Sequence, residues 1–172
     1  MRPTLQRAAV ALLIACAYLA PARAAPPPAA PTDAYLGLLV GRWDYTGTLL
    51  GKPVRYHGAG RWVLANGWLR LSLVDAARPP AYRAEVYLGF DAKAGDYIAH
   101  WLDQFGAAGA RVLATGKREG QKLVLLFPYT EGAFRDTFEL SQDGSGGSLL
   151  IEAQEKDGHW STFASYTLTR AH

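Results

Sequence analysis

Apolar and polar side chains alternate along most of the chain after residue 40, and this period of two is typical of β-strands with one buried face. The longest alternation lies near the end of the chain, where one predicted face carries Trp160, Thr162, Ala164, Tyr166 and Leu168. Segments 82–91, 134–140 and 149–156 alternate in the same way. Each of these segments is therefore predicted to be a strand that turns one face to a core and the other to water.

Clusters of glycine, proline, asparagine and aspartate separate these segments at intervals of about 11 to 15 residues, a rhythm typical of antiparallel meanders. Asn66-Gly67 and residues 143–147 are examples. No segment between the clusters has a helical period, so neighbouring strands are expected to pair antiparallel. The predicted fold class is all-β: a single antiparallel up-and-down β-barrel of about ten strands. A membrane-spanning barrel is not expected, because the predicted outer faces carry charges and hydroxyls.

One short helix is predicted before the first strand. Thr32 or Asp33 provides the N-cap, residues 34–40 form the helical turn, and Gly41 ends it. The barrel domain is accordingly expected to span residues 33–170, and the Pro/Ala-rich segment 25–32 before it is expected to be a disordered spacer.

The first 24 residues have the three parts of a signal peptide. Arg2 and Arg7 precede an apolar run over residues 8–20, and Ala22-Arg23-Ala24 is a small-residue cleavage site. The apolar run is shorter than the roughly 20 residues of a transmembrane helix. Removal of residues 1–24 and release into the periplasm or the medium is the expected outcome, and no membrane span is expected.

Leu13-Ile14-Ala15-Cys16 offers an alternative outcome, because this segment resembles the lipobox of bacterial lipoproteins. Lipidation of Cys16 would then tether the barrel to a membrane. In the other case Cys16, the only cysteine, leaves with the signal peptide. The mature chain then has no disulfide and no cysteine-based metal or redox site.

The net charge of +3 belongs to the signal peptide. Arg2, Arg7 and Arg23 all precede the cleavage site, so the 18 Lys and Arg fall by three and equal the 15 Asp and Glu. A neutral mature chain without a basic run argues against nucleic acid as a partner.

A short helix followed by Gly41-Arg42-Trp43 at the start of the first strand resembles the lipocalin and wider calycin signature. The second half of that signature is an arginine late in the last strand, which Arg170 provides. Segments 88–91 and 97–103 also resemble a family of uncharacterised secreted bacterial proteins with a lipocalin-like domain. The resemblance implies that Arg170 stacks on Trp43 as a structural clamp, with a cation–π contribution of about 0.5–2 kcal/mol.

Large aromatic residues are spread over the predicted strands and suggest a pocket for a small hydrophobic or aromatic ligand. The alternative is that these side chains fill the core completely. The candidate ligand-binding residues, two acids included, are Tyr45, Trp62, Trp68, Tyr82, Trp101, Asp103, Tyr129, Asp136 and Trp160.

Asp136 and Asp103 are the candidates for chemistry. Asp136 lies between Phe134 and Phe138 on an apolar face, where a carboxylate is costly unless it has a partner. The main hypothesis is binding without catalysis, and the alternative is a small barrel enzyme that uses these two acids as a pair. Neither a Gly-x-Ser-x-Gly nucleophile motif nor a phosphate-binding glycine loop is present in the sequence.

Histidine spacing predicts no metal site and no cofactor. Nitrobindin-like proteins, which are distantly similar ten-stranded barrels, hold haem through a histidine near the chain end. His159 lies in that region and represents the haem-binding alternative. It begins a strand on the side opposite the apolar face, so it is expected to point to water.

Overall fold

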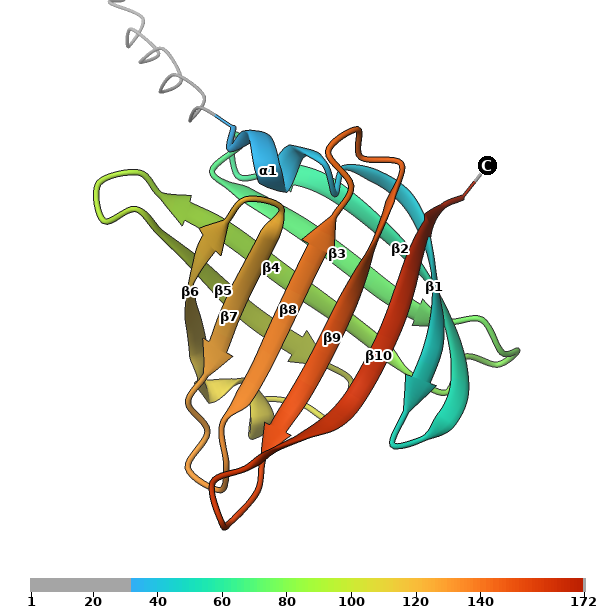
Figure 1. Ribbon diagram of the computed structural model, residues 1–172. Coiled ribbons are helices and arrows are strands. Elements are labelled where there is room, and N and C mark those ends of the chain that lie inside the picture. The colour runs from blue at the N-terminus through green and yellow to red at the C-terminus, as the bar shows by residue number, and fades with distance from the viewer. Residues whose placement is uncertain (1–31, 172) are drawn as a thin grey trace, which may run out of the picture.

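The computed structural model describes residues 32–171 (Figure 1). The predicted signal peptide, Cys16 and residues 25–31 of the predicted spacer lie outside the described residues. Within residues 32–171, no helix is both long and apolar enough to cross a membrane.

Ten strands form one closed barrel in which each strand pairs antiparallel with the next and the first pairs with the last. The strands are β1 (Gly41–Leu49), β2 (Lys52–Val63), β3 (Trp68–Asp75), β4 (Arg83–Asp91), β5 (Asp96–Asp103), β6 (Leu113–Glu119), β7 (Lys122–Phe127), β8 (Phe134–Leu140), β9 (Gly146–Gln154) and β10 (Trp160–Arg170). The predicted all-β, up-and-down barrel is therefore confirmed. Consecutive strands need no crossover connection because they are antiparallel neighbours, and this holds for the long β5–β6 connection too.

A four-residue helix, α1 (Ala34–Gly37), lies across one end of the barrel (Figure 1). The Asp33 carboxylate caps it by accepting a hydrogen bond from the Leu36 amide at 2.8 Å. The Tyr35 hydroxyl lies 3.1 Å from the backbone oxygens of both Gln121 and Phe138, so it can donate to these strand ends. A second short element, the 3-10 helix η1 (Gly109–Arg111), lies in the β5–β6 connection at the other end.

Gly60 lets the chain after α1 pack against the inner face of β2. A Cβ atom at this position would lie 2.0 Å from the Leu39 carbonyl oxygen, well inside van der Waals contact. Gly58, on the same face of β2, makes room for the ring of Tyr45 in the same manner, because a Cβ there would lie 2.5 Å from that ring. These two glycines leave room in the barrel interior for both the chain after α1 and the Tyr45 ring.

Burial follows the predicted alternation over most of the barrel. On β8, Asp136, Phe138 and Leu140 are buried, while Arg135 and Glu139 are not. On β9, Leu149 and Ile151 are buried as predicted. The interior faces of the ten strands and α1 merge into one hydrophobic core, as expected for a sheet that closes on itself.

The predicted face of the last strand is wrong in its first half. A β-bulge between Thr162 and Ala164 adds one residue to β10. An extra residue inverts the alternation on one side of the bulge, so Trp160 and Thr162 lie outside while Phe163 packs against the core. Ala164, Tyr166 and Leu168 face inward as predicted.

Candidate functional site at the barrel mouth

Arg170 and Trp43 hold the end of the barrel that α1 covers. The guanidinium carbon of Arg170 lies 3.9 Å from the centroid of the Trp43 ring. The same guanidinium donates to the backbone oxygens of Leu38, Val40 and Gly144 at 2.8, 2.5 and 2.8 Å. The Trp43 indole donates to the Leu39 oxygen at 2.9 Å. This end is thus closed by charge-assisted and backbone hydrogen bonds, which give Arg170 and Trp43 a structural role.

The end opposite α1, which we call the mouth, carries a different set of side chains. The connections β1–β2, β3–β4, β5–β6, β7–β8 and β9–β10 meet there (Figure 1). Six half-buried residues, which we call the mouth cluster, come from or next to these strand ends: Tyr82, Trp101, Asp103, Tyr129, Phe134 and Phe163. Beneath them lie three buried side chains with polar tips, namely Tyr56, Asp136 and Tyr166.

Trp101, Tyr82 and Asp103 are joined by hydrogen bonds. The Trp101 indole donates to the Tyr82 hydroxyl at 3.0 Å, and that hydroxyl donates onward to Asp103 Oδ2 at 3.4 Å. The Phe105 amide donates to Asp103 Oδ1 at 3.0 Å. Burial, with a smaller contribution from the charge of Asp103, raises the pKa of Tyr82 to about 12. Tyr82 therefore stays a neutral donor at physiological pH, and Asp103 already has protein partners.

The aromatic rings near the mouth form two runs in which neighbouring centroids lie 5.1–6.3 Å apart, the range for favourable aromatic pairs. The first run is Phe105, Tyr82, Tyr56, Tyr166 and Tyr45. The second run is Phe127, Tyr129, Phe134 and Phe163. Side chains that touch one another in this way give the mouth a mostly apolar wall with hydroxyl groups on it.

Asp136 lies near both runs, because its charge acts on Tyr129 in one and on Tyr166 in the other. It is 3% exposed, and its strand neighbours are Leu125 on β7 and Ile151 on β9. Burial alone raises the pKa of Asp136 to about 7, without a counteracting hydrogen bond or cation. Burial comes first among the causes that raise the pKa of Tyr129 and of Tyr166, and the charge of Asp136 raises both further. Within residues 32–171, no side chain or backbone group forms a hydrogen bond or ion pair with this carboxyl.

A carboxyl that is 3% exposed and has no hydrogen-bond partner among the described residues is unusual, because nearly all buried polar groups in native proteins are hydrogen-bonded. Its oxygens are not fully enclosed, since Arg70 Nε is the only fully enclosed side-chain polar atom without a partner in this part of the chain. Its pKa near 7 leaves both protonation states accessible at physiological pH. The group can therefore donate one hydrogen bond when protonated, or bind a cation when ionised. Either property suits a side chain that contacts a ligand.

Of the predicted ligand-binding residues, the structure brings five together at the mouth: Tyr82, Trp101, Asp103, Tyr129 and Asp136. Tyr45 is buried deeper in the barrel. Trp62 packs against the core near the end covered by α1, since its pairing partner is Leu69 at the start of β3.

Trp68 and Trp160 lie on the outside of the barrel and do not belong to the mouth cluster. Trp68 precedes the inward-facing Leu69, and its ring covers Gly89 on β4, where an added Cβ would lie 3.0 Å from that ring. The Arg135 guanidinium carbon, on the outer side of β8, lies 4.4 Å from the centroid of Trp160. Of the candidate ligand-binding residues, the structure therefore does not bring Trp68 and Trp160 to the barrel interior.

Tyr56, Tyr166, Phe134 and Phe163 also belong near the mouth, although none was among the candidate ligand-binding residues. Three of them lie on the apolar side of their strand's alternation, so the pattern contained a signal for them. For Phe163 the pattern contained no such signal, because only the bulge in β10 turns this side chain inward.

Two shallow surface depressions adjoin the mouth, and Leu102 and Asp103 border both of them. One extends to Ala110 and Arg111 in the β5–β6 connection, and the other extends over β3 and β4 as far as Ser72. Both lie on the outer side of the strands. Deeper in the barrel the aromatic side chains pack against one another, so the mouth is the part of the interior that a ligand reaches first.

His100 and His159 make their hydrogen bonds to groups other than Asp136. His159 is 62% exposed and bonds to Asp157 in the β9–β10 turn. His100 bonds through Nε2 to the Ala110 oxygen at 2.7 Å. Among residues 32–171, no three His, Cys, Asp or Glu side chains gather as metal ligands do.

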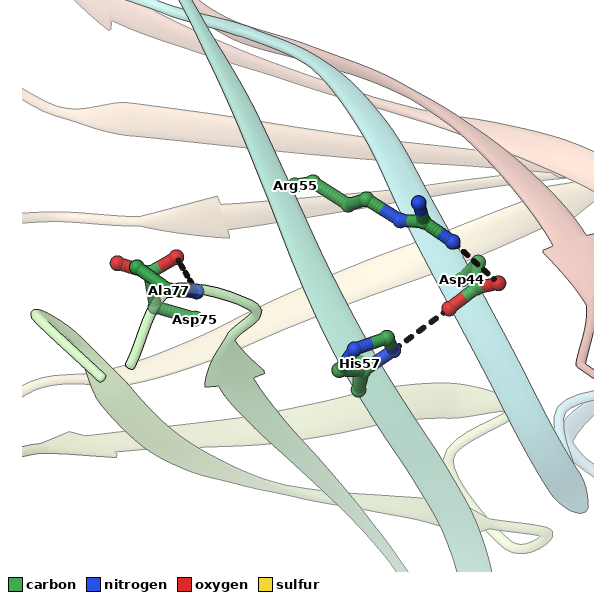
Figure 2. A network of polar contacts seen from close by, with 5 residues as sticks. All are labelled: Asp44, Arg55, His57, Asp75 and Ala77. Atoms are coloured by element: carbon green, nitrogen blue, oxygen red, sulfur yellow. Dashed lines mark hydrogen bonds and ion pairs between the residues drawn. The ribbon is translucent and has the colours of Figure 1, made fainter. Parts of the chain in front are cut away.

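A separate polar network covers the outer face of β1 and β2 (Figure 2). Asp44 accepts from Arg55 at 3.1 Å and pairs with His57 Nδ1 at 2.7 Å. The hydrogen bond from His57 is the main cause that lowers the pKa of Asp44. Figure 2 also shows Asp75, which accepts from the Ala77 amide and so shapes the loop after β3. The charged groups on β1 and β2 are largely exposed, so they contribute little to stability.

Comparisons with known proteins locate the chain by its fold. The sequence matches no protein-family model and no curated protein sequence. The structure is similar to the crystal structure of Rv2717c from M. tuberculosis, with a TM-score of 0.56 and 14% sequence identity over 83% of this chain and 100% of that one. At this level of identity the likeness concerns the barrel fold alone.

Proposed function

We propose that this chain is an exported, lipocalin-like binding protein whose mouth takes a small apolar or aromatic ligand. The observation that carries the proposal is the position of Asp136. A buried carboxyl that no side chain of the described residues bonds lies near tyrosines of two runs of aromatic rings, at the end of the barrel opposite α1. Ligand sites commonly combine an apolar wall with a few polar groups that fix orientation.

Binding is favoured over catalysis because the acids at the mouth lack a reaction partner on the protein. Asp103 accepts from Tyr82 and Phe105, which position it without activating it. His100 turns outward to Ala110. Tyrosine and tryptophan side chains, by contrast, provide large contact areas at low conformational cost, which suits a binding role.

Export belongs to the same proposal and rests on the three-part layout of residues 1–24. Intact-mass analysis of soluble and membrane fractions distinguishes the outcomes. A mature chain that starts at Ala25 supports secretion, and a lipidated start at Cys16 supports the tethered alternative. A mature chain that retains Met1 contradicts both.

A titration followed by tryptophan emission tests binding at the mouth, with 2-phenylethanol and decanoic acid as probes. We expect saturable quenching by at least one probe, because a ligand at the mouth contacts Trp101. Trp101→Phe should remove the response, whereas Trp68→Phe, on the outside of the barrel, should retain it. Flat titrations with both probes, or a response that persists in Trp101→Phe, would contradict binding at the mouth.

A further inference from the structure

We propose that the ligand of the mouth carries a protonated amine that pairs with Asp136. This inference rests on the proposed function and names the chemical class of the ligand. The amine would lie against the Asp136 carboxylate, and the apolar part of the ligand would extend outward along the mouth cluster.

The first step concerns the missing partner of the Asp136 carboxyl. Asp136 is 3% exposed and lies between the aliphatic side chains of Leu125 and Ile151. Ionising it there without a partner is costly. Removing one partner of a buried ion pair destabilises a protein, and supplying the missing partner has the opposite effect. A cationic ligand would supply that partner.

The second step is the charge of everything that faces Asp136. The titratable groups whose fields overlap with it are Tyr129, from the β7–β8 connection, and Tyr166 on β10. Tyr56 and Tyr82 adjoin Tyr166, and Asp103 acts on both Tyr82 and Tyr129. In the described part of the chain, no lysine, arginine or histidine contributes to the pKa of Asp136. The groups around Asp136 are therefore neutral or negative, and they favour a cationic ligand over an anionic one.

The third step is the aromatic wall. Tyr129, Phe134 and Phe163 on one side and Tyr56 and Tyr166 on the other lie in edge-to-face pairs near Asp136. The faces of aromatic rings attract cations, by about 0.5–2 kcal/mol per contact in general. The tyrosine hydroxyls can also accept hydrogen bonds from ammonium N–H groups. The set resembles the chemistry of amine recognition more than that of a carboxylate or a plain hydrocarbon.

Calorimetric titration with three probes of similar size tests the inference: 2-phenylethylamine, 2-phenylethanol and phenylacetate. At pH 8 we expect the amine to bind at least about tenfold more tightly than the alcohol. Its affinity should rise about tenfold between pH 6 and pH 8, because Asp136 ionises across that interval while the amine remains protonated. Alcohol affinity should change little.

Asp136→Asn keeps the shape of the side chain and removes its charge. We expect this variant to bind the amine only as tightly as the alcohol, with no dependence on pH. Glu139→Gln is the matched control, because Glu139 lies on the outer side of the same strand. It should bind all three probes as the wild type does. Unchanged amine affinity in Asp136→Asn would overturn the inference.

Three outcomes separate this inference from the proposed function. Equal affinity for amine and alcohol would refute the amine alone and leave binding at the mouth standing. Phenylacetate that binds best, and more tightly as the pH falls, would also refute it, since Asp136 would then act as a protonated donor. No binding of any probe at millimolar concentration would refute both proposals.

Discussion

Ionising the buried carboxyl of Asp136 costs free energy, and this cost should be measurable as a pH dependence of the free energy of unfolding. Its pKa is raised to about 7 in the folded protein, compared with about 3.9 in an unfolded chain. Between these values the folded state retains a proton that the unfolded state loses. The contribution of Asp136 to the free energy of unfolding therefore falls as pH rises from about 4 to about 7, by up to about 4 kcal/mol.

Urea unfolding of the wild type and Asp136→Asn between pH 4.5 and 8 measures this difference. The variant should gain stability relative to the wild type as pH rises and should be the more stable of the two above pH 7. Glu139→Gln, which retains Asp136, should keep the slope of the wild type. A constant difference in the free energy of unfolding between wild type and Asp136→Asn across the pH range would show that the pKa of the carboxyl is not perturbed.

Trp43 and Arg170 contact each other at the covered end, where the guanidinium lies over the ring. Trp43→Ala removes a side chain that is 1% exposed and should lower the free energy of unfolding by about 3–5 kcal/mol. Arg170→Ala should cost less, because its main loss is the three hydrogen bonds to Leu38, Val40 and Gly144. Denaturant midpoints of both variants provide the measurement. If Trp43→Ala unfolds like the wild type, the ring does not anchor this end.

At the scale of single elements, the sequence predicted what depends on local chemistry. Asp33 caps α1 because its carboxylate reaches the Leu36 amide three residues on, a relation visible in the sequence. β8 has the predicted faces because its alternation is uninterrupted. The order of the strands followed from short turns, which leave antiparallel neighbours as the only arrangement.

The sequence could not predict features that depend on pairing between strands. The bulge at Thr162/Ala164 leaves the apolar alternation of β10 intact in the sequence while it moves Phe163 inward and Trp160 outward. Trp68 is a different case, because it shares a face of its strand with Arg70 and Ser72, opposite the buried leucines, so the alternation itself contained the signal for an outward position. Of the candidate site, the acids and tyrosines were therefore found more reliably than the tryptophans.

Docking of α1 gives a test at the element scale. Gly60→Ala would place a methyl group 2.0 Å from the Leu39 carbonyl oxygen, so the chain after α1 must shift. We expect a loss of about 1–3 kcal/mol, as for overpacked cores. Gly37→Ala is the control, because a Cβ there meets nothing within 4 Å. Thermal melts should show Gly37→Ala at or above wild type, and a tolerated Gly60→Ala would mean that α1 packs loosely.

For the whole molecule, the barrel combines one end held by backbone hydrogen bonds with another end lined by aromatic and acidic side chains. α1, Arg170 and Trp43 hold the first end. Asp136 and the mouth cluster lie toward the second. Under the proposed function, this polarity along the barrel axis assigns stability to one end and ligand binding to the other. The assignment predicts that a ligand changes the surroundings of the two ends unequally.

Chemical-shift mapping of the ¹⁵N-labelled mature protein with 2-phenylethylamine at pH 8 tests that central claim most directly. The largest amide shifts should fall at Asp136 and at residues of the mouth cluster such as Tyr82, Trp101 and Tyr129. Amides near Trp43, Leu39 and Trp62, at the end covered by α1, should move little. Shifts concentrated at the covered end, or on the outer network around Asp44, would contradict a binding site at the mouth.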